Sequence, residues 1–148
     1  MKYDHVAVYV SDMERALKLY RDFLGFTPIW DQVFPNEKLS AEVVEACFRM
    51  RGATLRDVFC ISPEGQKLEL VQPINPRPNL MSRDKIGYPN TGFQELALEV
   101  KNIDDWFKKV KDAGYETHAD FVWEIQGVLR SFLFYDGEGN IIQFVENT

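Results

Sequence analysis

The feature that most restricts the fold of this chain is an internal repeat. The segment HVAVYVSDMERALKLY at residues 5–20 matches ELALEVKNIDDWFKKV at residues 95–110 in pattern, with a constant offset of 90. In each copy, apolar residues first alternate with polar ones, as in a strand with one buried face, and then recur at helical spacing. The segments at 55–72 and 129–146 also match, with an offset of 74, and each predicts a two-stranded hairpin.

Each copy therefore predicts a strand, a helix and three further strands, with the segments at 26–34 and 115–123 supplying the second strand of each copy. The fall in offset from 90 to 74 means that the first copy holds 16 additional residues between its helix and its hairpin. These residues fall within 36–53, where Ser40 stands before an apolar run at helical spacing. This pattern predicts a short extra helix that stops at Gly52.

The expected fold class is α+β, with two tandem βαβββ modules that form paired, curved, mixed sheets around a cleft and carry their helices on the outer face. We expect a single domain of residues 1–148, with module one at 1–72, a proline-rich linker at 73–91 and module two at 92–148. The length is near the commonest domain size, and 45% hydrophobic residues supply a proper core.

Composition excludes several classes of partner. The net charge is −6, from 17 basic and 23 acidic residues, so the chain lacks the basic excess of a nucleic-acid-binding protein. Its apolar runs are too short to span a membrane, and its first residues do not resemble a secretory signal, so we expect a cytoplasmic protein. Cys47 and Cys60 lack a CxxC spacing, and both are expected to be small buried hydrophobes.

Strand parity selects four polar residues. The apolar residues of each opening strand should face the helix, which leaves His5 in the first copy and Glu95 in the second on the opposite face. The same test on the closing strands turns Glu69 and its repeat partner Gln143 toward that face. The repeat therefore predicts that these four side chains point to the front of a pseudo-symmetric pair of sheets.

This set of side chains suits a metal ion. One imidazole, two carboxylates and a carboxamide oxygen can bind a divalent cation and leave positions open for water or a chelating substrate. Without a cation, neighbouring buried carboxylates would repel each other. We therefore predict a divalent ion (Ni, Zn, Mn, Fe or Co) held by His5, Glu69, Glu95 and Gln143. The alternative is a polar cleft in which these side chains hydrogen-bond to water.

The motifs DHVAVYV, SDMERALKLYRDFLGF, LELVQP and DGEGNIIQFVE resemble the vicinal oxygen chelate superfamily, which includes glyoxalase I, methylmalonyl-CoA epimerase, extradiol dioxygenases, fosfomycin-resistance enzymes and bleomycin-resistance proteins. In its glyoxalase and epimerase branches, the metal ligands come from the opening and closing strands of each module. The resemblance therefore implies that His5, Glu69, Glu95 and Gln143 are the metal ligands of this chain. Glu95 stands where such enzymes usually carry histidine, and Gln143 stands where they usually carry glutamate.

The resemblance implies a glyoxalase-like enzyme, a lyase or isomerase, in which a metal ion binds vicinal oxygens of a small-molecule substrate and promotes isomerisation, epimerisation or lyase chemistry. Because Gln143 has no titratable group, the catalytic base would be Glu69 or Glu95. A homodimer is also implied by the resemblance.

Two other functions stay open. The altered ligand types favour a metal-free protein that binds a small molecule, similar to the bleomycin-resistance proteins. A dioxygenase is the weaker alternative, because its iron site prefers two histidines and one carboxylate. The chain has only two histidines, and His118 is expected in the inner strand of the second copy, without a histidine at the matching position of the first.

Overall fold

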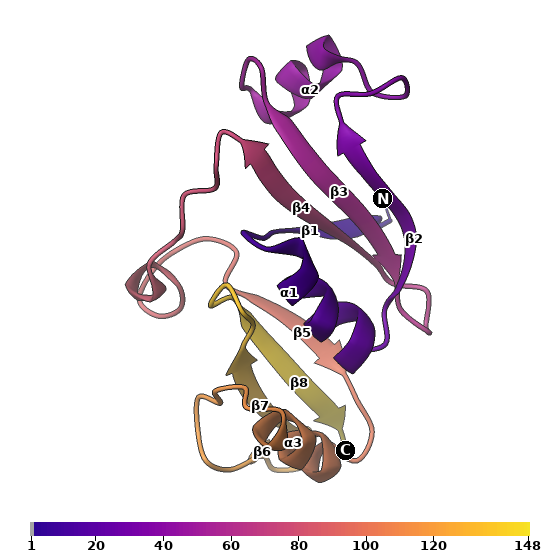
Figure 1. Cartoon of the computed structure of the whole chain (residues 1–148). Coiled ribbons are helices and arrows are strands. Elements are labelled where there is room, and N and C mark those ends of the chain that lie inside the picture. The colour runs from indigo at the N-terminus through magenta and orange to yellow at the C-terminus, as the bar shows by residue number, and fades with distance from the viewer. Residues whose placement is uncertain (1) are drawn as a thin grey trace. The chain divides into compact units, whose positions relative to one another are not determined.

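The computed structural model of the protein describes residues 2–148 (Figure 1). The chain divides into two compact units, of which unit 1 ends at Leu80 and unit 2 runs from Met81 to Thr148. Unit 1 contains β1 (His5–Tyr9), α1 (Met13–Leu17) with the π-helical continuation η1 (Lys18–Phe23), β2 (Thr27–Phe34), α2 (Ala41–Phe48), β3 (Thr54–Ile61) and β4 (Lys67–Asn75). Unit 2 contains the 3-10 turn η2 (Arg83–Lys85), β5 (Glu95–Glu99), α3 (Ile103–Asp112), β6 (Trp123–Ile125), β7 (Leu129–Tyr135) and β8 (Ile141–Asn147).

The two sheets have the same topology. Their strand orders are β1-β4-β3-β2 and β5-β8-β7-β6, and in both the first strand pairs in parallel with the last while the others pair antiparallel. The repeat extends to the register, since Ala7 lies opposite Glu69 and Ala97 lies opposite Gln143. The predicted α+β class with two four-stranded mixed sheets is therefore confirmed. No helix among residues 2–148 is long and apolar enough to cross a membrane.

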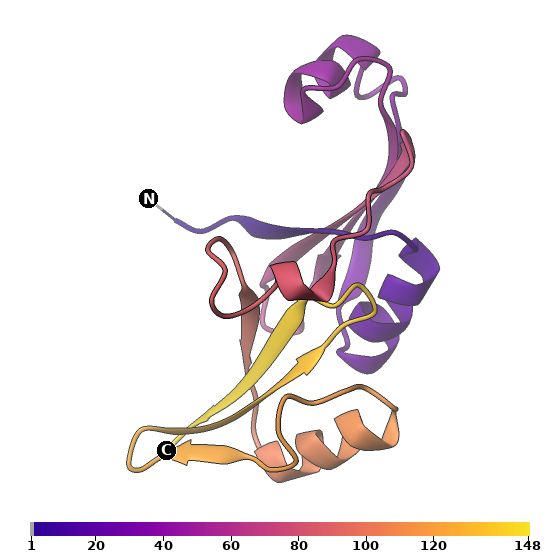
Figure 2. The ribbon, with the colours of Figure 1, turned by 90° about the vertical axis from the view of Figure 1, so that its left-hand side faces the viewer.

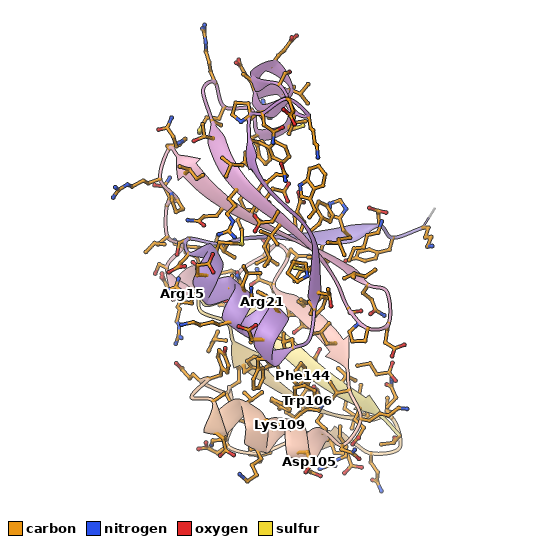
Figure 3. All side chains as sticks on the ribbon, turned by 45° about the vertical axis from the view of Figure 1, so that its right-hand side comes forward. Arg15, Arg21, Asp105, Trp106, Lys109 and Phe144 are labelled. Carbon is orange, nitrogen blue, oxygen red and sulfur yellow. The ribbon has the colours of Figure 1, made fainter. Side chains whose placement is uncertain are left out.

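The back face of each sheet is apolar and is covered by one helix. In unit 2, α3 presents Trp106 to Phe144 and Phe107 to Phe132, each with ring centroids 5.1 Å apart in edge-to-face geometry (Figure 3). Phe132 and Phe144 are almost fully buried, as is Phe134. Phe132 and Phe134 are therefore core residues, and the polar residues that alternate with them point away from α3.

The extra helix predicted within 36–53 is confirmed as α2, but it lies on the face of the first sheet opposite α1 (Figure 2). Its Val44 packs with Phe34, Leu55 and Val71, all buried. Because α2 rests on the sheet along this narrow strip, Cys47 is exposed, and the prediction that both cysteines are buried is wrong for this one. The helix ends earlier than predicted, with Arg49 rather than Gly52 in the left-handed position after its last residue.

The start of each back-face helix is capped partly by a side chain from another element. At α1, the carboxylate of Asp12, not the hydroxyl of Ser11, accepts a hydrogen bond from the backbone N–H of Arg15 (3.1 Å). At α3, Asn102 makes no side-chain cap, and Glu146 Oε1 accepts from its N–H (2.5 Å). Capping by a side chain from the closing strand is repeated in unit 1, where Gln72 accepts from the N–H of Met13. A neighbouring strand therefore supplies part of each cap.

Two further segments depart from the sequence prediction. The strand predicted at 115–123 is mostly absent, because the chain makes one isolated bridge at Thr117 and then bends, and β6 begins only at Trp123. Phe121 lies exposed in that bend, although the sequence prediction counted it as part of a strand. The second part of the predicted linker belongs to unit 2, where the guanidinium of Arg83 pairs with Glu116 (2.7 Å) and lies 4.4 Å from the Tyr135 ring centroid.

A repeated arginine ties each sheet to its helix. In unit 1, Arg56 donates to both carboxylate oxygens of Asp31 (2.9 and 2.7 Å) and to Glu14 (2.7 Å) in the first turn of α1. In unit 2, Arg130 donates to both oxygens of Asp104 (2.8 and 2.7 Å), the residue that matches Glu14 in the repeat. The hydrogen bonds from Arg56 hold the pKa of Asp31 below its ordinary value. Both arginines are therefore engaged with protein carboxylates on the back face.

Replacing Arg56 with methionine is expected to lower the free energy of unfolding by about 1 kcal/mol at neutral pH, a small value because the pair is partly exposed. Since the pKa of Asp31 is lowered on folding, this stabilisation is present above the unfolded-state pKa of about 4 and is lost as the pH falls through the lower folded-state value. Urea unfolding at pH 7 and in acid measures both effects. Arg21→Met is the control, because Arg21 pairs with the adjacent Asp22, and an equal loss in both variants would contradict the assignment.

Candidate functional site

The candidate site begins with the front face of each sheet, which we define as the face that carries Glu69 in unit 1 and Gln143 in unit 2. In unit 1, Ala7 and Phe59 lie opposite Glu69 on its two neighbouring strands and share its face. His5 precedes Ala7 by two residues and so also lies on that face. The structure thus places both unit 1 residues of the predicted ligand set on the front face.

His5 and Glu69 are in contact. The distance from His5 Nε2 to Glu69 Oε2 is 3.3 Å, and the side chain of Glu69 is only 16% exposed. The other ring nitrogen, His5 Nδ1, lies 3.0 Å from Asp4 Oδ2, and this hydrogen bond is the main cause of a lowered pKa at Asp4. Both ring nitrogens of His5 thus face carboxylate oxygens, which can only accept; with its proton on Nδ1 the ring would present a lone pair at Nε2, where a metal ion would take the place of a proton. A histidine whose distal nitrogen is anchored in this way is oriented as a metal ligand.

Asp57 is a member of the site that the sequence analysis did not identify. Its residue is 7% exposed, it lies opposite Val71 on the front face of β3, and its Oδ1 atom has no hydrogen-bond partner. Burial and the neighbouring charge of Glu69 raise the pKa of Asp57 to about 7. A buried carboxyl with an unsatisfied oxygen, next to a second carboxylate and an imidazole, is an environment that a divalent cation would stabilise.

Tyr9 borders the same group of side chains. Burial raises the pKa of its hydroxyl, and the charges of Glu69 and Asp57 raise it further. The hydroxyl of Tyr9 therefore stays protonated at neutral pH and is available as a hydrogen-bond donor on the front face. Its repeat partner is Glu99, which takes the matching place opposite Val145 in unit 2.

In unit 2, Gln143 is held by an uncharged partner. Its Nε2 donates to Ser131 Oγ (2.9 Å), and the fully buried Ser131 hydroxyl donates to the carbonyl oxygen of Phe144 (2.8 Å). Ser131 matches Asp57 in the repeat, so the buried partner of the closing-strand residue is a carboxyl in unit 1 and a hydroxyl in unit 2. Because the Gln143 amide nitrogen is engaged, its carbonyl oxygen is the atom left to bind a ligand.

Glu95 is exposed at the start of β5, two residues before Ala97, which lies opposite Gln143. In unit 1, His5 likewise stands two residues before Ala7, which lies opposite Glu69. His118 lies after the bridge at Thr117, with its ring 4.5 Å from that of Tyr135. Burial lowers the pKa of His118, while the charges of Glu116 and Glu95 oppose that shift. The structure therefore brings His118 into the electrostatic field of Glu95, a proximity that the sequence pattern did not indicate.

Each unit supplies two side chains that could bind a metal ion, His5 and Glu69 in unit 1 and Glu95 and Gln143 in unit 2. Metal bonds of about 2.1 Å place neighbouring ligand atoms about 3 to 3.5 Å apart, which agrees with the 3.3 Å between His5 and Glu69. Across residues 2–148, however, no group of three or more His, Cys, Asp or Glu side chains is arranged to hold a metal ion. The convergence of His5, Glu69, Glu95 and Gln143 on one ion stays a prediction.

Asp57→Asn is expected to stabilise the metal-free protein at pH 8. Since the pKa of Asp57 is raised on folding, ionisation of this group favours the unfolded state, and the free energy of unfolding falls as the pH rises from about 4 to about 7. The substitution removes this contribution. Urea unfolding between pH 4 and pH 8 in a chelating buffer measures it, and Glu64→Gln, which removes an exposed carboxyl between β3 and β4, is the control. An unchanged pH profile in Asp57→Asn would contradict the assignment.

Comparison of the sequence with protein-family models gives one match. The model described as the Glyoxalase/Bleomycin resistance protein/Dioxygenase superfamily matches residues 2–144. No curated protein matches the chain.

Solved structures share the fold at low sequence identity. A glyoxalase family protein from Bacillus cereus superimposes with a TM-score of 0.83 at 16% identity, covering 99% of this chain and 94% of its own. A glyoxalase family protein from Enterococcus faecalis gives 0.68 at 21% identity, covering 98% and 97%. A variant of the fosfomycin resistance protein FosX from Listeria monocytogenes, in complex with Mn(II) and 1S,2S-dihydroxypropylphosphonic acid, gives 0.65 at 13% identity, covering 99% and 90%.

Proposed function

We propose that this chain, which belongs to the glyoxalase/bleomycin resistance protein/dioxygenase superfamily, is a metal-dependent enzyme that acts on a small molecule with two neighbouring oxygens. The observation that carries the proposal is the His5–Glu69 pair, with Nδ1 of His5 anchored on Asp4 and Nε2 turned to Glu69. We propose that Glu95 and Gln143 complete the ligand set. The reaction would be an isomerisation, an epimerisation or a lyase step.

Each side chain has a distinct role in this proposal. When bound, a divalent ion polarises two substrate oxygens as a Lewis acid and makes an adjacent C–H bond more acidic. Glu69 is held between His5 and Asp57 and is little exposed, so it is suited to a fixed ligand role. Glu95 is exposed and has freedom to move, so we assign it to accept the proton from the substrate carbon and return it.

Gln143 and Tyr9 would act without changing charge. The amide of Gln143 has no titratable group and is fixed by Ser131, so it can orient a ligand but cannot move a proton. The Tyr9 hydroxyl, kept protonated by burial and by its carboxylate neighbours, can donate a hydrogen bond to a substrate oxygen. These roles make Glu69 and Glu95 the two candidate catalytic carboxylates of the chain.

A metal-free binding protein, resembling the bleomycin-resistance proteins, is the second candidate. It is favoured by Glu95 and Gln143, which differ from the residue types usual at these positions. In that case Asp57 and Glu69 would share a proton in place of a cation, and the front face would hold its ligand through hydrogen bonds alone. A homodimer stays a prediction under either function.

Protein purified without chelator is expected to contain one equivalent of Ni, Zn, Mn, Fe or Co, or to take one up on dialysis, as measured by elemental analysis. His5→Ala is expected to lose this equivalent because it removes the only imidazole that contacts Glu69. His118→Ala is the matched control, since it removes the other histidine and should keep the metal. Wild-type protein that neither contains nor takes up metal would support the binding protein instead.

Glu95→His is expected to tighten binding of Ni(II) or Zn(II) by about tenfold, because imidazole nitrogen is a better donor than a carboxylate oxygen for these ions. Isothermal titration calorimetry with Ni(II) or Zn(II) measures the dissociation constant of each protein. Glu99→His is the control, because residue 99 lies four residues after Glu95 on the same face of β5 and is not assigned as a ligand. Equal affinities in wild type and Glu95→His would remove Glu95 from the ligand set.

A further inference from the structure

The front face of unit 1 carries a row of side chains that crosses the whole sheet. Ala7 of β1 lies opposite Glu69 of β4, Glu69 lies opposite Phe59 of β3, and Phe59 lies opposite Trp30 of β2. Residues opposite one another in a sheet turn their side chains to the same face. Two aromatic rings therefore follow the carboxylate of the candidate metal ligand across the sheet, Phe59 on the adjacent strand β3 and Trp30 on the next strand β2.

One end of this face is closed and the other is not. The covered end is the cluster of Phe34, Leu55 and Val71 under Val44 of α2. The row with Glu69 lies beyond this cluster, two residues from Val71 along β4 and four residues from Leu55 and Phe34 along β3 and β2. On its β1 side, Glu69 lies opposite the small, exposed Ala7. The His5–Glu69 pair and Phe59 thus lie beyond the cluster that α2 covers, and Trp30 packs against the border of that cluster.

The two rings have defined neighbours. Phe59 meets the His5 ring edge-on, with centroids 5.1 Å apart. Trp30 stacks on Phe34 at 6.2 Å, and the ammonium of Lys38 lies 4.7 Å from its ring centroid. Phe59 and Trp30 are both only half-buried. Aromatic side chains that stay partly open beside a charged pair offer a flat apolar surface with a positive charge at its far edge.

We propose that Phe59 and Trp30 form an aromatic subsite, so that the substrate carries an aryl group attached to the carbon that bears one of its two vicinal oxygens. This inference rests on the proposed function and extends it to a substrate class. Neighbouring strands lie about 4.8 Å apart, so a ring over Phe59 is about one strand spacing from oxygens held at Glu69. That spacing fits direct attachment of the ring to the oxygen-bearing carbon and leaves the far side of the ring near Lys38.

The test compares two chelating probes that differ only in the ring. Acetohydroxamate and benzohydroxamate both present two neighbouring oxygens, and only the second carries a phenyl group on the adjacent carbon. Titration calorimetry on the metal-loaded protein gives both dissociation constants, each normalised to the affinity of that probe for the free metal ion. The protein is expected to prefer benzohydroxamate by about tenfold after this correction, the size of effect that one buried, well-packed ring provides.

Variants assign that preference to the two rings. Phe59→Leu keeps an apolar side chain of similar volume, and Trp30→Leu tests the second ring if the first variant folds poorly. Each is expected to reduce the preference for benzohydroxamate over acetohydroxamate at least threefold. Val33→Ala is the control, because its exposed side chain lies on the same strand as Trp30 but on the opposite face. Thermal unfolding of each variant verifies that it is folded.

The outcomes separate this inference from the proposed function. Metal uptake with equal normalised affinities for both probes, or with a preference that survives both leucine variants, would overturn the aromatic subsite and leave the metal-dependent function standing. No metal uptake by the wild-type protein would overturn the proposed function and the subsite together.

Discussion

The parallel pairing of the first strand with the last strand in each unit is the constraint on which the candidate site depends. Parallel partners need a long crossover connection, and here the helix and two strands between them supply it. The crossover buries the back of the sheet under α1 or α3, so the polar residues that alternate with the buried ones are turned to the front. The same register then sets His5 beside Glu69 and gives Glu95 the matching place relative to Gln143.

Although the two units share this backbone plan, their front faces differ in charge. Unit 1 combines Glu69 with the buried Asp57, whereas unit 2 combines Gln143 with the buried hydroxyl of Ser131. The carboxyls of Asp57 and Glu69 in unit 1 are therefore largely buried and lie next to His5, whereas Glu95 and Glu99 on the front face of unit 2 are exposed. This difference explains why the residues of unit 1 are assigned to hold the ion and an exposed residue of unit 2 is assigned to move the proton. The two units thus share one fold but differ in the chemistry of their front faces.

Much of this arrangement could be predicted from the sequence, because strand parity and the repeat offset are local properties of the chain. They placed His5 and Glu69 on one face and the apolar residues of the opening strand on the other. Asp57 was missed because a single carboxylate inside an apolar strand does not reveal its neighbours across the sheet. Its alignment with Ser131 was the available signal, since a polar residue recurs at that buried position. The helix caps were also missed, because Gln72 and Glu146 reach them from distant strands.

The central claim is that four side chains from both units bind one metal ion. The most direct measurement is anomalous diffraction at the zinc edge from crystals soaked in Zn(II). The account predicts a single strong peak about 2.0 to 2.2 Å from His5 Nε2 and from side-chain oxygens of Glu69, Glu95 and Gln143. A peak bound elsewhere, or a structure in which the two pairs of residues lie too far apart to share an ion, would contradict it.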